Sequence, residues 1–146
     1  MPKPIPIGAD HAGYAMKQVL ADELLRLGYE VEDVGTNSEA STDYADYAHT
    51  VAHEVEVGDA DRGVLLCGTG LGMSYAANRH HGVRAAVAWN EEVARLSRRH
   101  NDANILVLPA RCISNDEART ILRTWLDTKF EGGRHVDRIR KIEETV

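Results

Sequence analysis

Val64-Leu65-Leu66-Cys67-Gly68-Thr69-Gly70-Leu71-Gly72 is the stretch that decides the fold of this 146-residue chain. Its first four residues form a continuous apolar run, which is typical of a strand that is covered on both faces. The glycines that follow predict a tight turn, and a helix is expected to begin at Met73. Strands buried in this way occur in parallel sheets whose connections are helices, so the stretch indicates an α/β fold.

Further strand–helix units are expected on both sides of this stretch. The amino-terminal part predicts a strand at 5–9, a helix at 12–27, a strand at 29–34, a polar loop at 35–43 and a helix at 44–57. The carboxyl-terminal part predicts a strand at 83–89, a helix at 91–100, a strand at 105–108 and a helix opened by a Ser114–Glu117 capping box. The alternation predicts one domain over residues 1–146, with a mostly parallel sheet and helices on both faces.

An additional helix is expected at the end of the chain, over about residues 134–146. One stripe of this helix carries Val136, Ile139 and Ile142, and a different stripe carries Arg134, Arg138 and Lys141. Such a helix has an apolar side that can dock and a cationic side that can present charge.

Composition excludes several classes of protein. The net charge of −6 argues against a broad basic surface for nucleic acid. No apolar run approaches the ~18 residues that span a membrane, and the amino terminus does not resemble a secretory signal. The two cysteines, Cys67 and Cys112, are too few for a disulfide framework and lack the paired spacing of a zinc site. We therefore expect a cytoplasmic protein with two free thiols.

The residues after the predicted strands are candidates for chemistry, because ligands of α/β sheets bind at the carboxyl ends of strands. Three segments qualify: Asp10-His11, residues 67–72, and the region after Leu108. In the second, glycine amides can converge on one anionic oxygen beside the thiol of Cys67. The alternative is an ordinary tight turn after a buried cysteine, and the residues alone leave both interpretations open.

Nucleotide and metal sites fit the sequence poorly. The dinucleotide motif G-x-G-x-x-G would require glycine in place of Met73 or Tyr75, and no Gly-Lys-Ser/Thr of a P-loop is present. His49 and His53 have a spacing that can bind metal on a helix, but no third ligand is obvious nearby. The sequence therefore predicts neither a cofactor nor a metal.

Six segments together resemble one family. They are Gly8-Ala9-Asp10-His11-Ala12-Gly13, Thr42-Asp43-Tyr44, Cys67-Gly68-Thr69-Gly70-Leu71-Gly72, Ala76-Ala77-Asn78, Ser97-Arg98-Arg99-His100-Asn101-Asp102 and Glu131-Gly132-Gly133-Arg134-His135. In this order, and nearly from end to end, the sequence resembles the ribose-5-phosphate isomerase B family, which includes the galactose-6-phosphate isomerase subunits. The resemblance implies a Rossmann-like fold and a homodimer, or a dimer of dimers, with shared active sites.

The resemblance also implies a reaction and a role for each matching residue. The reaction is the metal-independent interconversion of ribose 5-phosphate and ribulose 5-phosphate through an enediolate, in pentose phosphate metabolism. Cys67 matches the general base, His100 the residue that opens the sugar ring, and Asp10 and Thr69 groups that handle hydroxyl protons. The anion hole corresponds to Gly68, Gly70, Leu71 and Gly72. The phosphate and sugar contacts correspond to His11, Tyr44, Asn101, Arg111, Arg134 and Arg138.

Two alternatives to this reaction remain. The same chemistry could act on a hexose 6-phosphate such as galactose or allose 6-phosphate, since pocket depth decides the substrate. A noncatalytic phosphosugar-binding module would keep the arginines but would have no need for a base.

Overall fold

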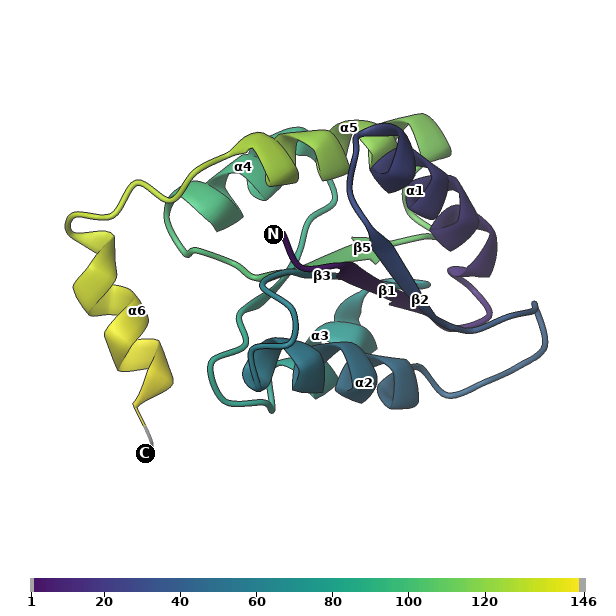
Figure 1. Cartoon of the computed structure of the whole chain (residues 1–146), viewed down its shortest axis with the longest axis horizontal. Coiled ribbons are helices and arrows are strands. Elements are labelled where there is room, and N and C mark those ends of the chain that lie inside the picture. Colours follow the sequence, from purple (N-terminus) through teal and green to yellow (C-terminus); the bar gives the residue numbers. More distant parts are fainter. Residues whose placement is uncertain (1, 145–146) are drawn as a thin grey trace.

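The computed structural model describes residues 2–144 and contains a five-stranded parallel sheet in the order β2-β1-β3-β5-β4 (Figure 1). The strands are β1 (Ile5–Ala9), β2 (Val31–Gly35), β3 (Gly63–Cys67), β4 (Ala85–Val87) and β5 (Ile105–Pro109). Every strand pair is parallel, so all carboxyl ends meet at one edge of the sheet. The predicted Rossmann-like α/β fold is confirmed.

Helices cover both faces of the sheet (Figure 1). The helices are α1 (Tyr14–Arg26), α2 (Tyr44–Glu56), α3 (Leu71–Ala77), α4 (Glu91–Arg99), α5 (Asn115–Asp127) and α6 (His135–Glu143). Residues of α1, α4 and α5 share one apolar cluster with the sheet, and residues of α2 and α3 share a second cluster on the opposite face. The sheet therefore has a separate apolar core on each side.

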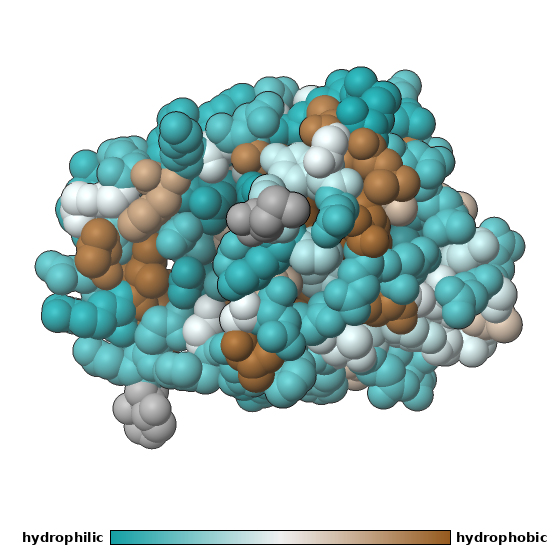
Figure 2. All heavy atoms as spheres, in the orientation of Figure 1, coloured by the Kyte–Doolittle hydropathy of each residue, from teal (hydrophilic) through white to brown (hydrophobic). Residues whose placement is uncertain are grey.

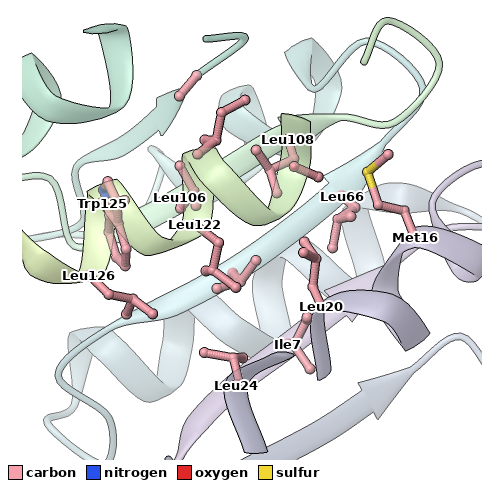
Figure 3. Close-up of a cluster of buried hydrophobic side chains, with 14 of the residues drawn as sticks. Ile7, Met16, Leu20, Leu24, Leu66, Leu106, Leu108, Leu122, Trp125 and Leu126 are labelled. Carbon is pink, nitrogen blue, oxygen red and sulfur yellow. The ribbon is translucent and has the colours of Figure 1, made fainter. Parts of the chain in front are cut away.

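The central strands hold this arrangement together. All five residues of β3 and all five of β5 are buried, as the apolar runs predict. On one face, Leu66 and Leu108 lie in the same cluster as Leu20 of α1 and Trp125 of α5 (Figure 3). Burying one such aliphatic side chain stabilises the folded chain by about 1.5–3 kcal/mol, so the core keeps the strand ends in register.

Several element boundaries differ from those predicted. Helix α3 begins at Leu71 rather than Met73, because Gly70 adopts the left-handed conformation with φ 80° and turns the chain into the helix two residues earlier. Leu71 and Gly72 are therefore helical and do not belong to the turn. Strand β4 covers only 85–87 of the predicted 83–89. The Ser114–Glu117 capping box of α5 is confirmed.

Helix α6 lies beyond the edge of the sheet where the strands begin (Figure 1). It runs from His135 to Glu143 and so is shorter than the helix expected over 134–146, of which residues 145–146 lie outside the described part. Its carboxyl end is held by Glu143, which accepts hydrogen bonds from Arg84 Nη1 at 2.6 Å and from the Gly82 amide at 3.1 Å. Across residues 2–144, no helix has the length and apolar character needed to cross a membrane.

Candidate active site

Asp10 lies at the carboxyl end of β1, beside the end of β3. Its amide donates to the carbonyl oxygen of Leu66 at 3.2 Å, which places Asp10 next to Cys67 across the two strands. Its carboxylate Oδ1 accepts from the amides of Ala12 and Gly13 at 3.0 and 3.3 Å. These two bonds orient the buried carboxylate at the start of α1.

Cys67 is the last residue of β3 and is only 4% exposed. It belongs to the apolar cluster on the α2–α3 face, and its carbonyl oxygen accepts from the amide of Ala110 at 2.8 Å. This bond and the β3–β5 pairing fix the backbone from which the thiol projects. The structure thus places Cys67 at the edge where ligands of such sheets bind.

The turn after Cys67 contacts Arg111, and this contact could not be predicted from the positions of the two segments in the sequence. The amide of Arg111 donates to the carbonyl oxygen of Gly68 at 3.0 Å. A Cβ atom placed on Gly68 would lie 3.2 Å from both Cδ and Nη1 of Arg111, so the guanidinium lies against this glycine. A predicted phosphate contact and the predicted anion hole are therefore adjacent.

The predicted anion-hole donors are not equivalent. The Leu71 amide donates to Oγ1 of Thr69 at 3.3 Å, so this donor already has a partner within the chain. Gly72 lies under the ring of Tyr44, because a Cβ on Gly72 would be only 2.5 Å from two ring atoms. Tyr44 therefore contacts the beginning of α3 directly.

His11 faces the loop that joins β2 to α2. Its Nδ1 accepts a hydrogen bond from the amide of Thr42 at 3.3 Å. In the neutral imidazole the proton then resides on Nε2, which makes that nitrogen a donor for a bound anion or hydroxyl. The Thr42 hydroxyl also bonds Tyr47 at 2.9 Å, and this bond anchors the loop on α2.

Four predicted site residues lie at the other edge of the sheet. Helix α4 runs back from the carboxyl edge, and the segment after it reaches the start of β3, where the Gly63 amide donates to the Asn104 carbonyl at 3.0 Å. The five residues of β3 span roughly 16 Å at about 3.3 Å per residue. The residues separated from Cys67 in this way are His100 and Asn101 after α4, and Arg134 and Arg138 at α6.

Around His100 the structure adds two residues that we had not predicted to be part of a site. The ring of His100 stacks on that of His135, with centroids 4.4 Å apart and planes 17° apart. Glu131 lies beside both rings: its Oε2 is 3.9 Å from Nε2 of His100, and its Oε1 is 3.9 Å from Nε2 of His135. Burial lowers the pKa of His135, and the nearby charges of His100 and Arg134 lower it further. Glu131 and His135 both belong to the segment 131–135, which is one of the six family-like segments. That resemblance was the signal in the sequence that could have identified them as site residues.

One chain therefore contains two separate groups of predicted site residues. Asp10, His11, Tyr44, residues 67–72 and Arg111 line the carboxyl edge of the sheet. His100, Asn101, Arg134 and Arg138 lie at the amino edge.

Comparison with known proteins identifies the class to which this fold and site belong. Residues 5–142 match the family model described as Ribose/Galactose Isomerase. The chain therefore belongs to the ribose/galactose isomerase family, and it is an isomerase.

Among individual members of this family, the chain is similar to ribose-5-phosphate isomerases. The chain is 44% identical to ribose-5-phosphate isomerase B of Escherichia coli over 140 residues, which cover 96% of this chain and 94% of that one. A crystal structure of the ribose 5-phosphate isomerase of Thermotoga maritima matches with a TM-score of 0.95 and 53% identity, covering 98% and 99% of the two chains. The enzyme of Mycoplasma genitalium, solved with bound ribulose-5-phosphate, matches with a TM-score of 0.94 and 41% identity over 98% and 95%.

Proposed function

We propose that this protein interconverts ribose 5-phosphate and ribulose 5-phosphate, with Cys67 as the general base. The observation that carries the proposal is the position of Cys67. Cys67 stands at the carboxyl end of β3, with Asp10 at the end of the neighbouring strand and the glycine turn directly after it. A base, a hydroxyl-handling group and backbone amides are thus available to one substrate.

The reaction requires a proton to move between C2 and C1 of the open-chain sugar. Removing a proton from a carbon next to a carbonyl leaves negative charge on the oxygen, and preorganised N–H donors stabilise that charge as it develops. One such donor can lower the activation free energy by ~3 kcal/mol. In this proposal the amides of residues 68–72 supply the donors, although that of Leu71 also bonds Thr69.

The remaining residues prepare and hold the substrate. His100 assists the opening of the furanose ring, while Asp10 and Thr69 exchange protons with hydroxyl groups. His11 and the arginines hold the phosphate, because a guanidinium can form two parallel bonds to phosphate oxygens. Binding of the phosphate, at the end of the sugar away from C1 and C2, would keep the reacting carbon near the sulfur of Cys67.

We further propose that complete sites form between two copies of the chain. The separation of His100 and the α6 arginines from Cys67 supports this arrangement, since one chain cannot bring them to one substrate. Helix α6 also leaves Val136 and Ile142 exposed at 52% and 59%. Figure 2 shows hydrophobic surface in the region of α6, beside hydrophilic side chains. A second copy that covered the apolar stripe would bring Arg134 and Arg138 with it.

The decisive experiment compares substrates for the purified protein in the presence of a chelator. We expect turnover of ribose 5-phosphate with a kcat/KM well above that for galactose or allose 6-phosphate. A preference for a hexose phosphate would transfer the same chemistry to the larger substrate. Binding of phosphosugars without any turnover would leave a noncatalytic module, and loss of activity on chelation would exclude the direct enediolate mechanism.

The cellular setting follows from the proposed substrate. Interconversion of these two pentose phosphates belongs to pentose phosphate metabolism. Both cysteines are free thiols, which is compatible with the reducing environment of a cytoplasm.

A further inference from the structure

Two imidazoles and one carboxylate meet in a cluster that the proposed reaction only partly uses. One ring nitrogen of His100, one carboxylate oxygen of Glu131 and one ring nitrogen of His135 all lie within 4.8 Å of one another. The proposed reaction assigns a role to His100 but none to the other two. We propose that this cluster is a binding site for Zn²⁺ or a similar transition-metal ion, and that the bound ion inhibits the isomerase by occupying His100.

The strongest support is an unused nitrogen in a buried position. His135 is 4% exposed, and within residues 2–144 its Nε2 has no hydrogen-bond partner although it is buried. Leaving a buried polar atom unpaired is unfavourable, because the atom has lost its contacts with water and gained none in return. Coordination of a metal ion at Nε2 would remove that cost, because the lone pair would then have a partner.

The backbone brings the three ligands together from two segments. The amide of Glu131 donates to the carbonyl oxygen of Arg99 at 2.9 Å, and this bond ties residue 131 to the end of α4 beside His100. The turn through Gly132 and Gly133 then leads into α6, where the His135 amide donates to Gly132 at 3.2 Å. The cluster is therefore part of the fold and does not depend on mobile side chains alone.

The donor set suits zinc. Two imidazoles and one carboxylate are a ligand set found in zinc enzymes, with a fourth position left for water. Imidazole binds a metal ion through the lone pair of a ring nitrogen, and the unpaired Nε2 of His135 is such a nitrogen. Arg134 and Arg138 face the cluster and oppose a cation, whereas Glu131 favours it.

Binding requires a small rearrangement that the exposure of the residues permits. The Glu131 oxygens lie 3.9 Å from the two Nε2 atoms. Zn–N and Zn–O bonds of about 2.0–2.2 Å need the three atoms to approach further and the two stacked rings to tilt apart. The side chains of His100 and Glu131 are 35% and 49% exposed and can move, while the buried His135 stays in place.

The test measures binding before activity. Titration of the full-length protein with Zn²⁺ alone is expected to give one site per chain, and Co²⁺ is expected to give the visible absorption of a tetrahedral complex. His135→Gln and Glu131→Gln should each weaken binding at least about tenfold, since even changes around metal ligands cost 10–100-fold. Glu131 is half-exposed, so its variant keeps the test valid if the His135 variant fails to fold.

A matched control uses another pair of histidines. His49 Nδ1 bonds His80 Nε2 at 2.7 Å on the surface, so His49→Gln removes a histidine outside the cluster. Unchanged affinity in this variant supports the proposed site. Loss of Zn²⁺ binding in His49→Gln, or unchanged binding in both cluster variants, would overturn it.

The proposal that bound Zn²⁺ inhibits the isomerase rests on the proposed function, and inhibition is measured separately from binding. Zn²⁺ is expected to lower turnover of the wild-type protein, a chelator to restore it, and Glu131→Gln to need at least about tenfold more Zn²⁺ for the same inhibition. If the protein has no isomerase activity, the titration still decides whether the site exists. Binding without inhibition would disprove the inhibitory role and leave His100 free.

Discussion

The guanidinium of Arg111 lies against Gly68, and the amide of the same arginine donates to the Gly68 carbonyl at 3.0 Å. This contact joins the turn after β3 to the segment after β5. It also means that the residue after Cys67 must be small for Arg111 to keep its place.

Gly68→Ala is therefore expected to displace the guanidinium and raise KM for a phosphorylated substrate severalfold. The added Cβ would lie 3.2 Å from Arg111 Cδ, and a flexible exposed side chain can move away. The free energy of unfolding should change by no more than about 0.5 kcal/mol. Steady-state kinetics and urea unfolding measure the two effects. In an Arg111→Ala background the same change should add little to KM, and a full additional effect would place the guanidinium elsewhere.

Cys67→Ala should lower kcat by about 10²–10⁴-fold, the usual contribution of a positioned base. Affinity for a phosphosugar should remain close to that of the wild type, because our proposal assigns the phosphate to other residues. Turnover assays and calorimetric titration separate these quantities. Cys112→Ala is the control, since Cys112 is exposed and should be dispensable. Near-normal turnover of the Cys67 variant would remove this thiol as the base.

Mixing two inactive variants tests whether sites are shared between chains. Cys67→Ala and Arg138→Ala are refolded together, and activity is assayed at substrate concentrations well below KM. Random pairing should restore about a quarter of wild-type activity, because each mixed dimer has one intact site. A mixture of Cys67→Ala with Asp10→Asn is the control, since both residues lie at the same edge of the sheet. Equal activity in the two mixtures would contradict a shared site.

Glu54→Gln should stabilise the protein at alkaline pH. Burial, a hydrogen bond with Glu32 and the nearby charges of Glu32 and Asp59 together raise the pKa of Glu54 from 4.5 to about 7. Between these values the folded chain holds a proton that the unfolded chain releases, so stability falls as pH rises from 4.5 to 7. The variant should gain on the order of 1–3 kcal/mol at pH 8 and little at pH 4.5, as measured by urea unfolding. A gain that did not depend on pH would exclude this carboxylate as the cause.

The order of strands and helices could be predicted from the sequence because it follows from local patterns. Continuous apolar runs marked β3 and β5, and the Ser114–Glu117 pair marked the start of α5. The start of α3 was predicted two residues late. The left-handed conformation of Gly70 fixes that boundary, and a glycine in the sequence permits this conformation without requiring it.

The candidate site depended on the sequence and the tertiary structure in different ways. The chain itself determined which chemical groups are present, among them the thiol of Cys67, the carboxylate of Asp10 and the arginines of the last helix. Only the fold decided which of these groups meet. Parallel pairing brings Asp10 to Cys67, whereas the return of α4 carries His100 to the opposite edge beside His135. The reason is physical: residue types and periodicity act over a few positions, while distances between strand ends depend on pairing and packing across the whole chain.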